Sequence, residues 1–561
     1  MFRSLNHRPA HHLVILTAAA VLTLPGLGRA SLWDMDEGLN AEAAREMLES
    51  GNWVVPKFSF QLRDAKPALL YWLQAGTYRL FGVNEFAARL PSALAAALAA
   101  LLSYELARRM FSPAAGLLGG LILISTLTVS QSGRFANPDA LLLGCTALTF
   151  SCFWAGYAPG RAGEPPRRGW FVPLGATCGL GMLAKGPVGL VLPGATILLF
   201  LAWQRQLWTL LDRRLFLGAA AFLLVALPWY AAVSIETRGD FATGFFLKNN
   251  FGRYLRPMED HRGPVYYHAG VLLMGFAPWS ALLPVALWYA MRRPAAANTP
   301  FSPVRATDPA RRLLLCWFAV YLAFFSLSAT KLPNYTLPLY PAVALLTGQF
   351  LDCWRRGETR PPVWLVTVGL ASLPAIGIGT VAALQVLGGG WSIPSLHVTT
   401  MENLQRTWWI GLIPILGGLL GLLGLIAGRR RLVIGSFCVT SVLFLSALGL
   451  FLADRVDALK ATRGLVAEAH TFDRGRDIRL ASFQYTQPSL VFYNQREVRP
   501  LLNDEQVVEF LNSPLPAYLF VPEPVWNAVA AKHPGLARPT LARKWDLYKQ
   551  CEIIVVSNQA D

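Results

Sequence analysis

Long apolar stretches alternate with short polar loops along most of this chain. Counting the stretches long enough to cross a hydrocarbon core of ~30 Å predicts about thirteen membrane spans. The pattern is typical of a polytopic α-helical membrane protein. The predicted spans lie near residues 12–30, 92–110, 114–131, 138–157, 170–184, 186–202, 215–235, 266–290, 313–328, 335–351, 363–388, 408–427 and 431–453.

Clusters of basic residues fall in every second loop between these spans. Because such clusters stay on the cytoplasmic side, they predict a cytoplasmic N-terminus and a C-terminus on the opposite side. The clusters are Arg108–Arg109, Arg167–Arg168, Arg213–Arg214, Arg292–Arg293 with Arg311–Arg312, Arg355–Arg356 and Arg429–Arg431. The other loops are then periplasmic: 31–91, 132–137, the turn at Lys185, 236–265, 329–334, 389–407 and the tail after Phe451.

Two of these outer segments are long enough to fold. The first, 31–91, has helix-like stretches at 41–50 and 67–81, and the aromatic content of the second predicts a helix in the membrane interface. The sequence therefore divides into a membrane domain, 1–453, and a small α/β domain outside the membrane, 454–561. In the tail we predict helices near 456–469 and 504–511, a turn at Pro522-Glu523-Pro524, and strands at 478–483, 489–493, 517–521, 544–548 and 552–556.

Composition agrees with a membrane protein, since 54% of the 561 residues are hydrophobic and only 15% are charged. A net charge of +17 suggests nucleic-acid binding in a soluble protein. Here the basic residues lie between apolar spans, so membrane anchoring explains them and no nucleic-acid partner is expected. The seven cysteines are scattered and predict neither a disulfide framework nor a metal site.

Ionisable and phenolic residues gather at the outer ends of the predicted spans. Such groups are costly beside hydrocarbon, so each needs a partner or a polar cavity. One shared outer cavity would satisfy them all. The residues are Asp34, Asp36, Glu37, Lys66, Arg134, Asp139, Lys185, Arg253, Arg256, His261, Lys331 and Tyr335.

The carboxylates of this group have a structural alternative. Asp36 and Glu37 open a helical stretch, where acidic side chains also favour the positive end of the helix dipole. Asp139 begins a span directly after Asn137-Pro138, where it could serve as a helix cap.

The basic residues of this group indicate a site that binds an anion. Lys66 begins an interfacial helix and is a candidate phosphate ligand, with snorkelling to the interface as the alternative. Lys331 and Tyr335 share a short outer turn and could reach an anionic headgroup, unless they serve only the turn. Residues 248–262 are basic on the outer face, where cytoplasmic anchoring does not apply. His261 has no His or Cys at ligand spacing, so we predict no metal there.

Several segments resemble a known family. Trp33–Met47, Lys66–Trp72 and Phe81–Pro91 are similar to the opening of the aminoarabinose transferase (ArnT-like) family, with further similarity at 261–264 and 331–341. These are membrane glycosyltransferases of the C-type (GT-C) superfamily, related to protein O-mannosyltransferases. The resemblance implies a thirteen-span core with a periplasmic α/β domain. It also implies transfer of a sugar from a polyprenyl-phosphate carrier to an outer-leaflet acceptor of the bacterial inner membrane, often lipid A.

The resemblance assigns roles to individual residues. It implies that Asp36 and Asp139 are the catalytic carboxylates, and we expect four residues to bind the donor phosphate: Lys66, Arg253, Lys331 and Tyr335. Further candidates for the cavity are Asp34, Glu37, Asp64 and His261.

One departure from the family bears on metal binding. Many relatives have Glu directly before the lysine, whereas this chain has Ala65, with Asp64 one residue earlier. Nor does it have a histidine around Asn249-Asn250, where some relatives carry one. These departures argue against a bound divalent metal and leave open whether Asp64 takes the place of the glutamate.

We therefore expect a glycosyltransferase that moves aminoarabinose, or another amino sugar, from undecaprenyl phosphate to lipid A or a similar acceptor. A protein O-mannosyltransferase-type enzyme is the alternative, with a polypeptide hydroxyl as acceptor. A lipid or sugar transporter would also have many spans, but the charges gather on one face and no inverted repeat is evident. A membrane-anchored binding protein would need its polar site in the tail.

Overall fold

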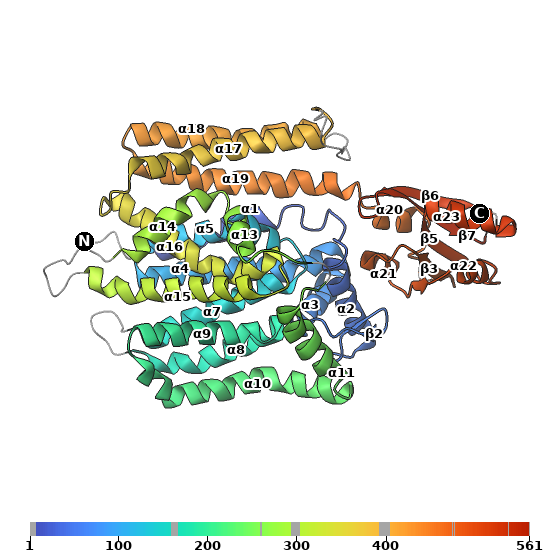
Figure 1. Cartoon of the computed structure of the whole chain (residues 1–561), viewed down its shortest axis with the longest axis horizontal. Helices are drawn as coiled ribbons and strands as arrows, with labels where there is room; N and C mark the ends of the chain where they lie inside the picture. The colour runs from blue at the N-terminus through green and yellow to red at the C-terminus, as the bar shows by residue number, and fades with distance from the viewer. Residues whose placement is uncertain are drawn as a thin grey trace.

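The structure, a computed structural model, describes residues 7–158, 166–258, 261–292, 303–391, 404–473, 475, 477–536 and 538–559. Long helices lie side by side and form most of the molecule, and a smaller α/β unit built from the C-terminal residues lies at one end of them (Figure 1). The helices α2 (Glu37–Ser50) and α3 (Leu69–Phe81) lie at the same end.

Seven described helical stretches are long and apolar enough to cross a membrane. Two shorter apolar helices, α5 (Pro113–Ile124) and α9 (Val188–Trp203), lie among them, together with α1 (His7–Thr23), α8 (Phe171–Lys185) and α16 (Tyr340–Arg356). The seven are α4 (Glu85–Met110), α7 (Pro138–Tyr157), α10 (Arg213–Glu236), the apolar part of α15 (Pro303–Leu327), α17 (Val363–Leu387), η7 with α18 (Leu404–Ile426), and α19 (Arg430–Asp457).

Two predicted spans are interrupted in the structure. The span predicted at 266–290 is a bent pair, α13 (Tyr267–Gly275) followed by η5 (Trp279–Leu282) and α14 (Leu283–Met291), with an angle of 114° between its halves. Pro278 lies at the break, where it cannot donate the backbone hydrogen bond that would continue the helix. The span predicted at 114–131 is divided at extended Thr126 into α5 and α6 (Leu127–Ser132). The count of thirteen spans stays a prediction.

Glycines allow the central helices to approach closely. A Cβ added at Gly116 of α5 would lie 2.7 Å from the carbonyl oxygen of Tyr104 on α4, and one added at Gly120 would lie 2.9 Å from that of Ala100. Small residues at helix contacts are characteristic of membrane proteins, because packing there replaces the hydrophobic effect as the force that joins helices. This packing fixes α4, whose first turns carry Arg89, the partner of Glu37.

The outer segments are largely helical. The predicted helices of the first loop are present as α2 and α3, with the short strands β1 (Lys57–Phe58) and β2 (Gln61–Leu62) between them. The outer segment 236–265, which we treated as a loop, contains α11 (Asp240–Ala242), a π-helix η4 (Thr243–Gly252) and α12 (Arg253–Leu255). Lys248 and Arg253 are therefore carried by helices, whereas Arg256 follows α12 in an extended conformation.

The C-terminal unit has a five-stranded sheet in the order β4-β3-β5-β7-β6. The strands β3 (Arg479–Phe483), β4 (Arg499–Leu501) and β5 (Ala517–Pro522) are parallel, whereas β7 (Cys551–Ser557) runs antiparallel to β5 and to β6 (Thr540–Asp546). The helices that accompany the sheet are α20 (Ala461–Glu468), α21 (Pro488–Asn494), α22 (Asp504–Leu511) and α23 (Glu523–Lys532).

Two predictions for the tail were wrong. The strand predicted at 489–493 is the helix α21, which begins at Pro488; proline favours the first turn because its fixed φ suits a helix and the missing N–H has no partner there. The turn predicted at Pro522–Pro524 is the point where β5 ends and α23 begins, again with proline in the first turn.

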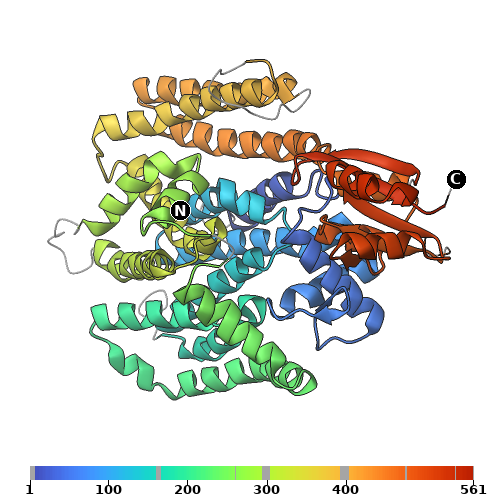
Figure 2. The same ribbon diagram turned by 45° about the vertical axis from the view of Figure 1, so that its right-hand side comes forward.

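The C-terminal unit packs onto the first outer segment (Figure 2). Helix α2 contacts α21, and a Cβ added at Gly38 of α2 would lie 2.8 Å from the backbone nitrogen of Ser489. Only glycine permits this approach, so the start of α2 is enclosed by the C-terminal unit on one side and by the membrane helices on the other.

Candidate active site

Glu37 fixes the start of α2 to the membrane helices. Its carboxylate is buried and accepts hydrogen bonds from the Arg89 guanidinium at 2.7 and 2.8 Å, from the Ala136 backbone at 2.7 Å and from the Trp33 backbone at 2.9 Å. A carboxylate with four donors around it is satisfied where it lies. Glu37, a candidate for the cavity, is thus a structural tie between α2, α4 and the segment before α7.

Asp34 joins the same segment to the C-terminal unit. Its buried carboxylate accepts a hydrogen bond of 2.7 Å from the Ser489 backbone, and its own backbone nitrogen donates to the Tyr548 hydroxyl at 3.2 Å. Burial raises the pKa of Asp34 to about 6, although the hydrogen bonds from Ser489 oppose the rise. Two residues earlier, the Leu32 backbone donates to the Tyr493 hydroxyl at 2.8 Å. The C-terminal unit therefore holds residues 32–34 directly before Asp36.

Asp36 lies between these two anchored carboxylates and differs from both. It is exposed, it precedes the first residue of α2, and its side chain does not cap the helix. Among the residues that the structure describes, no hydrogen bond or ion pair engages its carboxylate. Asp36 is thus the one acidic side chain of Asp34–Glu37 that a substrate can contact without breaking a structural bond.

Lys66 occupies the same electrostatic neighbourhood as Asp36. Burial and the nearby ammonium of Lys185 lower the pKa of Lys66 to about 8; Arg253 adds to the lowering, while Asp139 and Asp36 oppose it. Within the described chain, the Lys66 ammonium has no hydrogen bond or ion pair. A cation that is partly desolvated, and not already bound to a carboxylate, is suited to an anionic ligand.

Asp139 is held by an ion pair in which Lys185 donates to its Oδ1, while the Asn334 amide donates to Oδ2 at 2.8 Å. Helix capping does not explain Asp139, because the Asn137 side chain caps α7 by accepting from the backbone nitrogens of Asp139 and Ala140. Asp139 comes from α7, Lys185 from the end of α8 and Asn334 from η6 (Pro333–Leu339). The ion pair thus joins three elements beside Lys66.

In the short turn at residues 329–334 and the start of η6, Tyr335 contacts the charged group of the site, whereas the Lys331 ammonium is bound to a backbone carbonyl. The Tyr335 ring lies 5.1 Å from the Lys185 ammonium and stacks on His268 with 6.4 Å between ring centroids. Lys331 is buried, and its ammonium donates to the Ser326 carbonyl at 2.6 Å, at the end of α15. Burial lowers the pKa of Lys331. Its ammonium would have to leave this carbonyl to bind a phosphate.

The remaining candidates lie at the edge of this group. Arg253 begins α12, and its positive charge contributes to lowering the pKa of Lys66. Asp64 accepts a hydrogen bond of 3.3 Å from the Asn249 amide and packs so tightly on Gly244 that an added Cβ would overlap its carboxylate. His261 is exposed, and its carbonyl accepts from the Lys331 backbone at 2.9 Å. No group of three or more His, Cys, Asp or Glu in the described ranges could hold a metal ion.

Arg134, also expected at the outer cavity, has a structural role. Its guanidinium donates to backbone carbonyls of Thr23, Pro25 and Gly449, at 3.3, 2.9 and 3.0 Å. Thr23 is the last residue of α1, Pro25 follows it, and Gly449 lies within α19, so Arg134 joins the end of α1 to α19.

Sequence reasoning missed the partners that fix the site. The roles of Arg89 and Asn334, and those of Ser489, Tyr493 and Tyr548 in the tail, were not predicted. The sequence could have predicted a structural role for Arg89, because a charged side chain within an apolar helix needs a partner. The tail residues carried none, since a backbone amide and tyrosine hydroxyls form contacts that depend on the fold.

Comparisons with known proteins find relatives of this chain by sequence and by structure. The family described as dolichyl-phosphate-mannose-protein mannosyltransferase matches residues 65–231. The undecaprenyl phosphate-alpha-4-amino-4-deoxy-L-arabinose arabinosyl transferase of Serratia proteamaculans is 32% identical over 73% of this chain and 70% of its own. The same-named protein of Erwinia tasmaniensis is 29% identical over 78% of this chain and 75% of its own.

Among solved structures, ArnT from Cupriavidus metallidurans bound to undecaprenyl phosphate is similar over 99% of this chain and 98% of its own, with a TM-score of 0.79 and 26% identity. Together with the apolar helices, these similarities make the chain a multi-pass bacterial inner-membrane protein with the GT-C fold. The chain belongs to the family of undecaprenyl phosphate-aminoarabinose arabinosyl transferases, which are membrane glycosyltransferases.

Proposed function

We propose that this protein transfers 4-amino-4-deoxy-L-arabinose, or another amino sugar, from undecaprenyl phosphate to lipid A or a similar acceptor in the outer leaflet. The names of its relatives and the undecaprenyl phosphate bound to its structural neighbour support this donor. The observation that carries the proposal is the group of three cations and two carboxylates formed by Lys66, Lys185, Arg253, Asp36 and Asp139. In our proposal this group and the C-terminal unit face the periplasm.

The cations act on the donor. When the bond between the sugar C1 and the phosphate oxygen breaks, its electron pair stays on that oxygen, and the undecaprenyl phosphate leaves with an added negative charge. Lys66 and Arg253 stabilise this charge as it develops, an electrostatic contribution that grows in a partly desolvated site. The Tyr335 ring helps to hold the Lys185 ammonium, which lies beside it. Lys331 binds the donor phosphate only if its ammonium exchanges the Ser326 carbonyl for a phosphate oxygen.

The carboxylates act on the acceptor side. Asp36 orients the acceptor oxygen that attacks C1 and takes a proton from it if the acceptor arrives protonated. An ionised phosphate of lipid A has no proton to lose, so for that acceptor Asp36 acts by positioning. Asp139 holds the Lys185 ammonium in place, with Asn334 fixing its second oxygen.

The decisive experiment is mass spectrometry of lipid A from cells that lack the gene and are complemented with variants of it. Wild type should restore the amino-sugar adduct, whereas Asp36→Asn, which loses the charge that positions the acceptor, should reduce initial transfer by about 100-fold. Glu509→Gln, which removes an exposed carboxylate from α22, is the matched control and should transfer normally.

Full transfer by an Asp36→Asn variant at normal membrane levels would remove Asp36 from the mechanism. If lipid A is unmodified by the wild type while a polypeptide gains a sugar, the acceptor is a protein hydroxyl, as in the mannosyltransferase family that matches residues 65–231. If the adduct is a hexosamine, the proposed reaction is kept and the transferred sugar is a hexosamine instead of 4-amino-4-deoxy-L-arabinose.

A further inference from the structure

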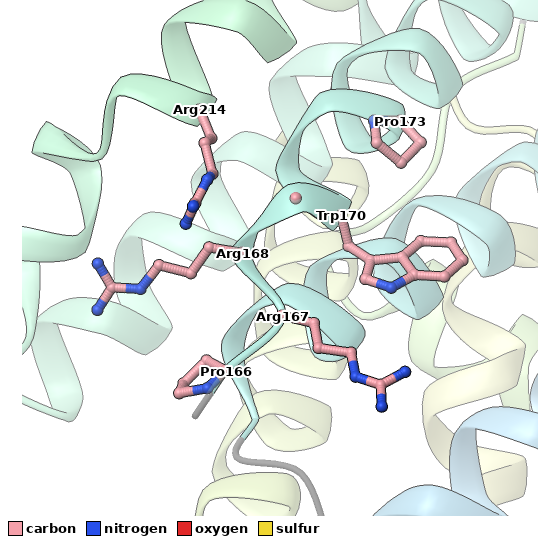
Figure 3. A pocket seen from close by; sticks show the side chains of 7 residues that line it. Pro166, Arg167, Arg168, Trp170, Pro173 and Arg214 are labelled. Carbon is pink, nitrogen blue, oxygen red and sulfur yellow. The ribbon is translucent and has the colours of Figure 1, made fainter. Parts of the chain in front are cut away.

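A second group of cations lies far from the candidate active site, at the other end of α8. Here a cavity of about 440 Å³ is lined by Arg167, Arg168 and Arg214, with Trp170 and two prolines (Figure 3). Helix α8 begins at Phe171, beside this cavity, and ends at Lys185, in the active site. At 1.5 Å per residue its 15 residues separate the two places by about 22 Å.

The cavity is positively charged. Arg168 pairs with Asp212 at 2.9 Å, and the same carboxylate caps α10 by accepting from the Arg214 backbone. The Arg214 guanidinium has neither hydrogen bond nor ion pair among the described residues. Among the described residues, Asp212 is the one carboxylate that pairs with Arg168 or Arg214. In Figure 3 Arg168 and Arg214 lie on one side of the cavity, with Arg167 beside Trp170 on the other.

An exposed apolar surface adjoins these cations. The short helix η3 (Leu207–Leu211) directly precedes Asp212, and its Trp208 is 81% exposed and Leu211 67%. Phe216, in the first turn of α10, is 66% exposed, and Trp170 is 42% exposed. Exposed tryptophans next to arginines are characteristic of the level of the lipid headgroups. A small soluble anion has no apolar part that could contact these exposed side chains, whereas a lipid has acyl chains.

We propose that this cavity binds the headgroup phosphate of an anionic phospholipid, from the leaflet at the end of the helices away from the C-terminal unit. Arg168 and Arg214 hold the phosphate oxygens, since guanidinium groups match them with paired hydrogen bonds. The acyl chains lie along η3 and the first turns of α10. Neither the donor nor the acceptor of the proposed reaction is involved, so this inference stands apart from the proposed function.

The test is lipid binding to the full-length protein in a zwitterionic detergent, measured by native mass spectrometry with phosphatidylglycerol as the probe. Arg168→Ala with Arg214→Ala should weaken binding by roughly 30-fold, taking each arginine at the value usual for a basic residue near an anionic surface. The matched control is Arg429→Ala with Arg431→Ala, which removes two exposed arginines from another basic cluster and should bind normally. Arg214→Ala alone, which spares the Arg168–Asp212 pair, should give an intermediate loss.

Three results would overturn the proposal. An equal loss in both double variants would mean that the arginines act only through net charge. Equal binding of phosphatidylcholine and phosphatidylglycerol would remove the role of headgroup charge. Displacement of the lipid by equimolar inorganic phosphate would make the site one for a free anion.

Discussion

The two ends of helix α8 differ in how far their ion pairs are buried. At the outer end, Lys185 is buried against Asp139, and the ion pair lies among Lys66 and other charged groups. At the other end, the Arg168 side chain is half exposed, although that of its partner Asp212 is largely covered. Burying a charge costs several kcal/mol unless it is paired, whereas an exposed pair is worth about 0–1 kcal/mol. In our proposals, the end at Lys185 keeps its charges for chemistry and the other end keeps them for contact with lipid.

The largest expected effect comes from breaking the buried pair. Lys185→Ala leaves the Asp139 carboxylate without its cation and should cost about 3–5 kcal/mol of stability, seen as a lower melting temperature in detergent. The corresponding change at the opposite end, Arg168→Ala, should cost about 1 kcal/mol or less. Lys185→Met combined with Asp139→Leu removes both charges and should regain much of the stability without regaining transfer. If Lys185→Ala and Arg168→Ala melt alike, the contrast between the two ends is wrong.

A smaller effect is expected where the C-terminal unit holds the segment before Asp36. Asp34→Ala leaves the Ser489 backbone N–H without its acceptor and should cost about 1–3 kcal/mol. Because the segment loosens, transfer should fall mainly through kcat, with KM for the lipid donor nearly unchanged, since Lys66 is untouched. Tyr548→Phe, which removes a hydrogen bond of 3.2 Å to the same residue, should show the same change in milder form. An Asp34→Ala variant that loses stability but keeps kcat would limit this contact to a structural role.

The smallest effect is a pH dependence set by Lys66. Its pKa is lowered to about 8, so the free enzyme carries this cation below pH 8 and loses it as the pH rises through that value. The sugar-phosphate diester of the donor does not titrate there. Donor kcat/KM should therefore fall above pH 8, by up to about tenfold per pH unit. Lys66→Arg stays charged and should flatten the profile, even if its activity is lower. A wild-type profile that is flat to pH 10 would show that the Lys66 charge is not needed.

Much of the membrane architecture is predictable from the sequence, because the need to cover hydrocarbon acts on each apolar stretch separately. The helices of the first outer segment are likewise present as predicted. The bend at Pro278 was missed because the hydropathy of 266–290 is continuous, and hydropathy does not register a missing backbone donor. In the tail, the β-branched and aromatic residues of 489–493 favoured a strand, whereas Pro488 and the packing of α21 on α2 produce a helix.

For the candidate site, the sequence by itself determined which residue types gather at one end of the helices, since charges beside hydrocarbon must be grouped there. The three carboxylates of Asp34–Glu37 have similar intrinsic chemistry, and only the resemblance to the family singled out Asp36 among them. The tertiary structure gives them different surroundings: Arg89 and the Ala136 backbone engage Glu37, Ser489 engages Asp34, and Asp36 is exposed. In the tertiary structure the Lys331 ammonium donates to a carbonyl of α15, whereas Lys66 has no such partner among the described residues. The physical reason is that a side chain becomes available to a substrate only when no closer group satisfies it, and those closer groups come from distant parts of the chain.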